Sequence, residues 1–130
     1  MSAAAPSILL LEDNPTHRNV CAFNLTNAGY RVTIAGLSAK ALVLARQQPF
    51  DLILTDYYLP DYPGTDFIRL LRQVDGYQRT PVILLTARAE ELNADKLRDE
   101  LLVSMLSKPC TMEKLVGTVS ECLAGAHCAS

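Results

Sequence analysis

Apolar residues in this 130-residue chain come in short runs, separated by longer stretches in which apolar and polar residues mix. Runs with an apolar core cover residues 8–11, 51–55 and 82–85, and their length and bulk are typical of strands buried on both faces. Two further segments, 30–35 and 103–107, place polar residues between apolar ones, as strands at the edges of a sheet do. The sequence therefore predicts five strands.

Each predicted strand is followed by a stretch whose apolar residues recur at helical spacing. These helices are predicted over about 14–28, 38–48, 65–74, 90–101 and 111–123. Asn14, Ser38 and Thr111 are the expected N-cap residues, and Gly29 is placed to end the first helix. Five strands alternating with five helices indicate an α/β fold, in which helices cover both faces of a parallel sheet.

The order of the strands follows from their polarity. The three solidly apolar strands belong in the interior and the two mixed strands at the edges. Right-handed crossovers with one reversal then allow the order 2-1-3-4-5, a doubly wound sheet whose first and third strands are neighbours at the ligand-binding switch point. We expect a single domain over residues 1–130, with an ordered core of about 7–124, because this length suits one hydrophobic core.

Charge and hydropathy exclude several classes of partner. The net charge is −2 and the estimated pI is 5.6, so we expect no direct contact with nucleic acid. The apolar runs are far too short to cross a membrane. The first residues lack the basic segment of a secretory signal, so the protein is expected to be cytoplasmic.

The cysteines and histidines suggest packing and surface roles. No CxxC pair occurs, and a cytoplasmic location favours reduced thiols. Cys21 and Cys122 fall on apolar faces of predicted helices, which favours packing. His17, near the start of a helix, is expected to be a solvated surface residue. His127 and Cys128 are the only close pair of nitrogen and sulfur ligands, and they lie in the carboxyl-terminal tail.

Polar residues at the strand ends carry the candidate chemistry. Glu12 and Asp13 follow the first strand, and Asp56, Thr86 and Lys108 follow the third, fourth and fifth. Carboxyl ends of parallel strands share one rim, where two carboxylates about 4 Å apart repel by roughly 4 kcal/mol at an effective dielectric of about 20. Mg²⁺ is the cation that best suits such oxygen ligands. The Thr86 hydroxyl and the Lys108 ammonium can donate hydrogen bonds to an anion, and a phosphoryl group is the obvious candidate. Asp56 is the carboxylate placed to act as a nucleophile.

Taken alone, each of these residues has an ordinary alternative. The acidic pair could be a solvated loop, Asp56 the start of a turn, Thr86 a helix cap and Lys108 a surface charge. It is much less probable that all of these ordinary explanations hold at once, at four separate strand ends.

Four segments together resemble the receiver domain of two-component response regulators: ILLLEDN (8–14), DLILTDYYLPDYPG (51–64), PVILLTA (81–87) and SKP (107–109). The resemblance extends over nearly the whole chain and implies a flavodoxin-like (βα)5 receiver fold. It also implies that Asp56 accepts a phosphoryl group from a phosphohistidine on a sensor histidine kinase or phosphotransfer protein. The protein would then catalyse only its own phosphorylation and dephosphorylation.

The resemblance assigns roles to particular residues. The implied Mg²⁺ ligands are Glu12, Asp13, Asp56 and the backbone carbonyl of Tyr58. Lys108 would pair with the phosphoryl oxygens, the Thr86 hydroxyl would hydrogen-bond to them, and the Lys108–Pro109 bond would be cis. The side chains of Tyr58 and Arg88 would tune hydrolysis of the aspartyl phosphate. A downstream protein would bind the face formed by the fourth helix, fifth strand and fifth helix.

The sequence departs from the family pattern in three places. Met105 stands where the family has an aromatic switch residue, so coupling from Thr86 to the last strand is expected to be altered or weak. Leu101 and Leu102 replace a small Gly-Ala pair, and they either pack on the core or enlarge an exposed partner surface. The candidate site is also rich in aromatics, which either shield it or contact the kinase: Tyr57, Tyr58, Tyr62 and Phe67.

Other functional classes fit less well. A phosphatase of the haloacid dehalogenase type would need a DxD pair after its nucleophile strand, which the sequence lacks. A nucleotide or flavin binder would need a GxGxxG motif or a P-loop, and the sequence has neither of these motifs. A pseudo-receiver, which binds partners without being phosphorylated, remains the alternative. The chain ends at Ser130, soon after the fifth helix, as a single-domain regulator or as part of a longer protein.

Overall fold

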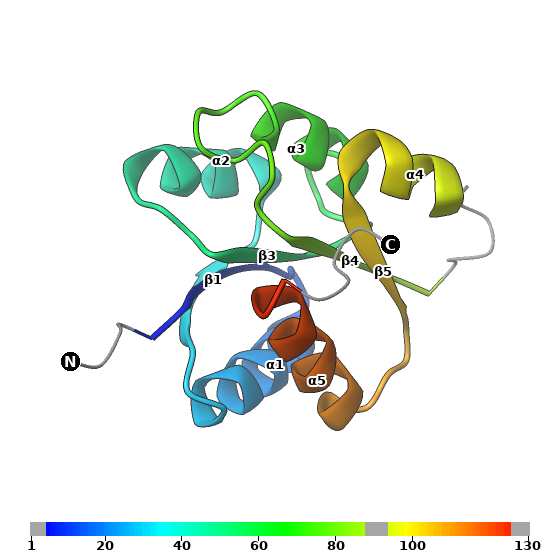
Figure 1. The fold of residues 1–130 in the computed structure, drawn as a ribbon. Helices are drawn as coiled ribbons and strands as arrows, with labels where there is room; N and C mark the ends of the chain where they lie inside the picture. Colours follow the sequence, from blue (N-terminus) through cyan, green and yellow to red (C-terminus); the bar gives the residue numbers. More distant parts are fainter. Residues whose placement is uncertain (1–4, 88–93, 126–130) are drawn as a thin grey trace.

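The computed structural model describes residues 5–87 and 94–125, and it places a parallel sheet between two layers of helices (Figure 1). The strands are β1 (Ser7–Leu11), β2 (Arg31–Ala35), β3 (Leu52–Asp56), β4 (Val82–Thr86) and β5 (Val103–Ser107). The helices are α1 (Pro15–Asn27), α2 (Ser38–Gln47), α3 (Gly64–Leu71), α4 (Ala94–Leu101) and α5 (Met112–Leu123). The strand order is β2-β1-β3-β4-β5, with every pair parallel, so the predicted α/β topology is confirmed.

Helix boundaries agree with the sequence patterns to within a few residues. The third helix ends earlier than predicted, at Leu71 rather than at residue 74. The first part of the predicted fourth helix, 90–93, lies outside the described residues. Figure 1 shows α1 and α5 on one face of the sheet and α2, α3 and α4 on the other.

Side chains of the central strands alternate between two apolar clusters. In β1, Leu9 and Leu11 join the cluster under α2, α3 and α4, while Ile8 and Leu10 join the cluster over α1 and α5. Because both faces are covered, every residue of β3 is buried, which explains its uninterrupted apolar run. At the edge of the sheet this requirement relaxes, and Ile34 of β2 is 39% exposed.

The helix ends show where local sequence signals succeed and fail. The side chains of Asn14 and Thr111 cap α1 and α5 as predicted, and Gly29 follows α1 with a φ of 102°. The expected cap at Ser38 is wrong. The carboxylate of Asp61, from the loop after β3, instead accepts hydrogen bonds from the backbone N–H groups of Ser38 and Ala39 at 3.0 Å each.

Arg72 holds two loops together at the opposite end of the sheet from the candidate site. Its guanidinium donates to the carbonyls of Tyr77 and Thr80 before β4, both at 2.7 Å. It also donates to the carbonyls of Leu101 and Leu102, at 3.0 and 3.1 Å, where α4 ends. One side chain therefore satisfies carbonyls that the end of a helix leaves without partners.

Of the two leucines at the end of α4, Leu101 packs inward. Leu101 is buried in the cluster under α4, so the expectation of core packing is confirmed for this residue. Leu102 is half-buried and has a φ of 58°, a left-handed conformation that costs a non-glycine residue roughly 1–2 kcal/mol. The hydrogen bond from Arg72 to its carbonyl helps to hold this conformation.

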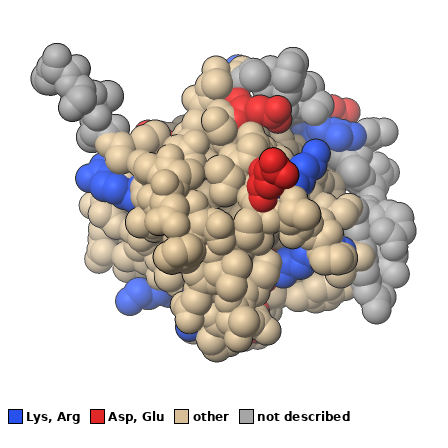
Figure 2. All heavy atoms as spheres, turned by 90° about the horizontal axis from the view of Figure 1, so that it is seen from below, with Lys and Arg blue, Asp and Glu red and all other residues tan. Residues whose placement is uncertain are grey.

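The face formed by α1 and α5 carries little charge. Figure 2 shows this face from below, with a few lysine, arginine and acidic side chains scattered among uncharged ones. Helix α1 exposes the apolar side chains of Val20 and Phe23, the latter by 65%. No helix within the described residues has the length and apolar character needed to span a membrane.

Gly64 sets the distance between α3 and the end of β3. Its N–H donates to the carbonyl of Tyr57 at 2.6 Å, which closes the loop after the strand. A Cβ atom at this position would lie 2.3 Å from the backbone oxygen of Asp56. Because the obstacle is backbone, only glycine lets the helix begin so close to Asp56.

We predict that Gly64→Ala lowers the free energy of unfolding by about 1–3 kcal/mol, the usual cost of forcing a methyl group into a packed site. Gly117→Ala in α5 is the matched control, because a Cβ there meets no atom within 4 Å. A helix-interior glycine replaced by alanine should instead stabilise by roughly 0.5–1 kcal/mol. Urea unfolding of both variants checks the contrast, and equal effects would contradict the steric argument.

Candidate functional site

The residues expected to carry the chemistry meet in a pocket at the carboxyl ends of the strands. The pocket has a volume of about 230 Å³. It is lined by Glu12, Asp13, Asn14, Asp56, Tyr57, Tyr58, Leu85, Thr86, Ala87 and Lys108. Residues from four separate segments thus converge, because β1, β3, β4 and β5 end along the same rim.

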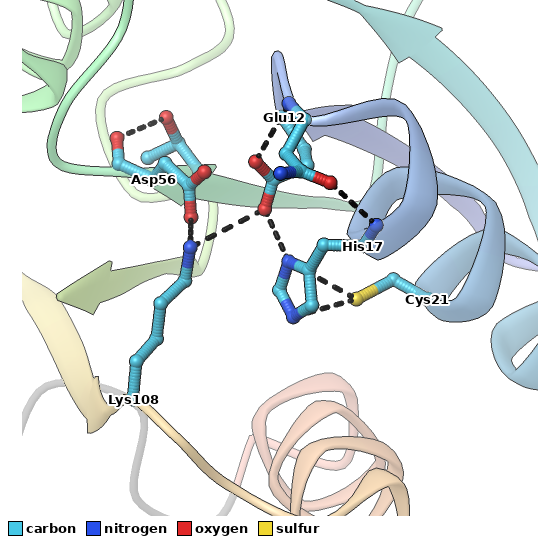
Figure 3. Close-up of polar contacts among 7 residues, drawn as sticks. Glu12, His17, Cys21, Asp56 and Lys108 are labelled. Carbon is cyan, nitrogen blue, oxygen red and sulfur yellow. Dashed lines mark hydrogen bonds and ion pairs between the residues drawn. The ribbon is translucent and has the colours of Figure 1, made fainter. Parts of the chain in front are cut away.

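Lys108 lies between two buried carboxylates (Figure 3). Its Nζ is 2.6 Å from Oδ1 of Asp56 and 3.3 Å from Oε1 of Glu12. Glu12 is 1% and Asp56 4% exposed, so little water screens these charges. Oδ1 of Asp56 is buried inside the site, and its partner is the Lys108 ammonium, with which it forms an ion pair.

Glu12 is fixed by the beginning of α1. Its Oε2 accepts a hydrogen bond from the backbone N–H of Asn14 at 3.1 Å, and its Oε1 contacts Nδ1 of His17. The Asn14 side chain in turn accepts from the backbone N–H of His17 at 3.0 Å. The helix cap and the candidate site therefore form one network.

The expectation that His17 is a solvated surface residue is wrong. Its side chain is only 32% exposed, and the imidazole points toward Glu12 while resting beside the Cys21 thiol, with Nε2 3.6 Å from Sγ (Figure 3). The missed signal is the spacing: His17 is three residues after the cap Asn14, where the first turn of α1 faces back to the strand end. Cys21 is fully buried, as its apolar helix face predicted.

The pKa values of Asp56 and Glu12 shift in opposite directions. Burial, followed by the neighbouring Glu12, raises the pKa of Asp56 to about 8 despite the opposing charge of Lys108. Burial alone would also raise the pKa of Glu12. Hydrogen bonds with Asp56, His17 and the Asn14 backbone, together with Lys108, outweigh burial and lower that pKa to about 2.

Nearby groups respond to the same charges. Burial would lower the pKa of Lys108, but the adjacent Asp56 and Glu12 carboxylates outweigh it and raise the pKa. Burial, then the charges of Glu12 and Asp56, raises the pKa of Cys21 to about 11, so this thiol stays protonated at neutral pH.

The remaining candidate residues lie around this centre. Asp13 and Tyr58 line the pocket, and both side chains are exposed. The Tyr58 ring packs edge-on against the Tyr57 ring, with a distance of 4.7 Å between the ring centroids. Thr86 is buried at the end of β4, and its carbonyl accepts a hydrogen bond from the backbone N–H of Lys108 at 2.8 Å. The Lys108–Pro109 bond is cis, as expected. Arg88 lies outside the described residues.

Met105 and the aromatic residues pack against the core. Met105 lies opposite Leu84 in the β4–β5 ladder and is half-buried against the cluster under α4. Phe67 is fully buried, while Tyr57 and Tyr62 are half-buried against the same cluster. These three rings therefore belong mainly to the core. Tyr57 and Tyr58 both line the pocket, and Tyr58 is the exposed one of the two.

The donor set fits a divalent cation. Glu12 and Asp56 are buried, and both line the same pocket as Asp13, so three carboxyl groups are available there. Mg²⁺ in proteins is typically held by one or two carboxylates with several waters retained, which this arrangement allows. Within the described residues, one group of three potential metal ligands has its ligand atoms within 4.8 Å of one another: Glu12, His17 and Asp56.

Comparison with known proteins identifies relatives over most of the chain. Residues 8–120 match the response regulator receiver domain family. The histidine-protein kinase BarA of Escherichia coli K12 is 32% identical over 88% of this chain, and the regulatory protein AfsQ1 of Streptomyces coelicolor is 39% identical over 68%. The chain spans only 12% and 38% of the length of these two relatives.

A solved structure with similar sequence shares the fold. The receiver domain of the sensor histidine kinase PA1611 from Pseudomonas aeruginosa matches with a TM-score of 0.79 and 34% identity. The match covers 94% of this chain and 99% of that one. That domain was crystallised with a magnesium ion coordinated in its active site cleft.

The raised pKa of Asp56 leads to a prediction about stability in metal-free buffer with a chelator. Stability tied to protonation of Asp56 is complete below the ordinary pKa of 3.8 and is lost as pH rises through about 8. At about pH 9 we expect Asp56→Asn to be more stable than the parent by roughly 1 kcal/mol or more, because one pKa unit corresponds to about 1.4 kcal/mol. The difference should shrink toward about pH 5, as measured by urea unfolding.

Asp75→Asn is the matched control, because this carboxylate is exposed in the segment after α3. It should follow the parent at every pH. If the parent and Asp56→Asn showed the same pH dependence, the destabilising effect assigned to the buried carboxylate would be refuted.

Proposed function

Because this chain belongs to the response regulator receiver domain family, we propose that it is a phosphoacceptor switch of two-component signalling, with Asp56 as the acceptor. The observation that carries the proposal is the buried Asp56 carboxylate at the end of β3, paired with Lys108 and facing Glu12. The donor is a phosphohistidine on a sensor histidine kinase or phosphotransfer protein. Relatives in both the kinase and the regulator classes support this choice.

Mg²⁺ is the proposed cofactor, held by Glu12, Asp13, Asp56 and the backbone carbonyl of Tyr58. The two buried carboxyl groups of Glu12 and Asp56, with Asp13 lining the same pocket, support this ligand set. When bound, the ion offsets negative charge on the oxygens of the phosphoryl group during transfer. A magnesium ion in the cleft of the PA1611 receiver domain supports the choice of metal.

The protein's own residues supply the nucleophile and position the phosphoryl group. An oxygen of ionised Asp56 attacks phosphorus, an O–P bond forms, and the P–N bond to the donor histidine breaks. Lys108, the ion-pair partner of Asp56, turns its ammonium to the incoming phosphoryl group and pairs with the phosphoryl oxygens by charge. The Thr86 hydroxyl, at the end of the neighbouring strand, hydrogen-bonds to one of these oxygens.

The switch follows from the added charge and acceptor oxygens of the aspartyl phosphate. Movement of Thr86 toward the phosphoryl group would act on Lys108, since the Thr86 carbonyl and the Lys108 N–H are hydrogen-bonded at 2.8 Å. It would also act on β5 through the ladder in which Thr86 pairs with Ser107. We propose that a downstream protein recognises the changed face formed by α4, β5 and α5. With Met105 in place of an aromatic ring, coupling from Thr86 to β5 is altered or weak.

Hydrolysis by water resets the switch. The exposed Tyr58 side chain borders the pocket and is proposed to tune the rate together with Arg88. The domain proposed for this role is residues 1–130, with an ordered core of about 7–124, and its placement in the cytoplasm stays a prediction from the sequence.

Incubation with acetyl phosphate and Mg²⁺, followed by intact mass, tests the proposal. The parent should gain one phosphoryl group, and Asp75→Asn should match it, whereas Asp56→Asn or the parent with chelator should gain none. Removal of the donor then gives the hydrolysis rate, which Tyr58→Ala and Arg88→Ala should each change. No gain in the folded parent would support the pseudo-receiver instead.

A further inference from the structure

His17 brings a nitrogen ligand into a pocket whose other ligands are oxygens. Its Nδ1 contacts Oε1 of Glu12, and its other ring nitrogen lies against the Cys21 thiol (Figure 3). The backbone of His17 is fixed through its N–H to the Asn14 side chain. The imidazole is therefore held from two sides with Nδ1 directed at the carboxylates.

The three potential ligands are close to the spacing that a small metal ion needs. Ligand atoms of Glu12, His17 and Asp56 lie within 4.8 Å of one another. Around a tetrahedral Zn²⁺, with bonds of about 2.1 Å, neighbouring ligand atoms are about 3.4 Å apart. Side-chain rotations alone can close this difference.

A second observation points to a cation in the same place. Oδ1 of Asp56 is buried, and the Lys108 ammonium lies 2.6 Å from it, so a cationic group already occupies the position that a metal ion would take. A metal ion would take this oxygen as a ligand and displace the ammonium by charge repulsion. It would also replace the contact between His17 and Glu12.

We propose that His17 makes this pocket a site for a transition-metal ion of the Zn²⁺ class, held by Glu12, His17 and Asp56. Imidazole nitrogen suits Zn²⁺, Ni²⁺ and Co²⁺, whereas Mg²⁺ prefers oxygen ligands alone. Three protein ligands leave a fourth position for water. Cys21 is not among the proposed ligands; its buried Sγ lies 3.6 Å from Nε2 of His17 and helps to hold the ring.

The inference rests on the divalent-cation site of the proposed function and adds a regulatory consequence. An ion bound by Asp56 and His17 occupies the carboxylate that phosphoryl transfer needs. Zn²⁺ would therefore compete with Mg²⁺ and reduce phosphorylation of Asp56.

Metal affinities of the metal-free full chain test the inference. Zn²⁺ and Mg²⁺ are titrated separately into the parent and into His17→Asn, with Co²⁺ absorption as a spectroscopic probe of nitrogen ligation. We expect His17→Asn to weaken Zn²⁺ binding by at least tenfold, because losing even an outer-shell partner of a metal ligand costs about 10- to 100-fold. Mg²⁺ affinity should change much less, and the Co²⁺ spectrum should lose intensity.

His127→Asn is the matched control, since His127 is the other of the two histidines in the chain. It should bind Zn²⁺ like the parent. His17→Gln repeats the test with a longer side chain, and thermal unfolding confirms that each variant is folded.

The outcomes separate this inference from the proposed function. Zn²⁺ binding that is unchanged in both His17 variants, or that is lost equally in His127→Asn, would overturn the inference. So would a parallel loss of Mg²⁺ affinity, because it would indicate general damage to the pocket. If the parent gains a phosphoryl group with Mg²⁺ but its Zn²⁺ affinity does not depend on His17, only the metal inference fails. If Zn²⁺ binds through His17 but no phosphoryl group is gained, the inference stands and the proposed function falls.

Discussion

The charge of Lys108 offsets part of the electrostatic repulsion within the site. Glu12 and Asp56 are both buried, and their carboxyl groups face one another at the ends of neighbouring strands. Two such carboxylates repel strongly where water is excluded, unless a cation lies close to both. The ammonium of Lys108, 2.6 Å from one carboxylate and 3.3 Å from the other, offsets part of this repulsion, and the raised pKa of Asp56 reflects burial and the part that remains. A pocket built in this way favours any cation that can replace the ammonium.

The sheet topology creates this arrangement from distant parts of the sequence. Glu12 and Lys108 are 96 residues apart, yet β1 and β5 end on the same rim as β3. Gly64 lets α3 begin against the backbone of Asp56, and Asn14 ties the start of α1 to Glu12. The carboxylates are therefore fixed by elements that are themselves packed on the core, which suits a site that must keep its geometry when charge changes.

Much of this architecture follows from local sequence patterns. Apolar runs predict the buried strands, and apolar residues at helical spacing predict the amphipathic helices. Short polar residues before a helix predict the caps Asn14 and Thr111. The rim residues could be grouped because parallel strands end together. The family resemblance added roles that periodicity alone does not give.

The residues that sequence reasoning missed act over long distances. Asp61 caps α2 from 22 residues away, and Arg72 binds carbonyls 29 and 30 residues along the chain. Neither has a local pattern, because an isolated Asp or Arg looks the same whether it faces water or a distant backbone. His17 was missed for a related reason: whether the first turn of a helix faces a site depends on the packing angle of that helix. Figure 3 shows that α1 turns the imidazole inward.

The most direct test of this account is the Mg²⁺ affinity of Lys108→Met, measured by titration calorimetry beside the parent. Lys114→Met is the matched control, because this lysine is exposed on α5. If the ammonium of Lys108 neutralises the two carboxylates in the place of a metal ion, its removal should make Mg²⁺ bind more tightly, while the control should match the parent. Unchanged or weaker binding to the folded Lys108→Met protein would contradict the central claim that Lys108 and a divalent cation compete for the same buried charges.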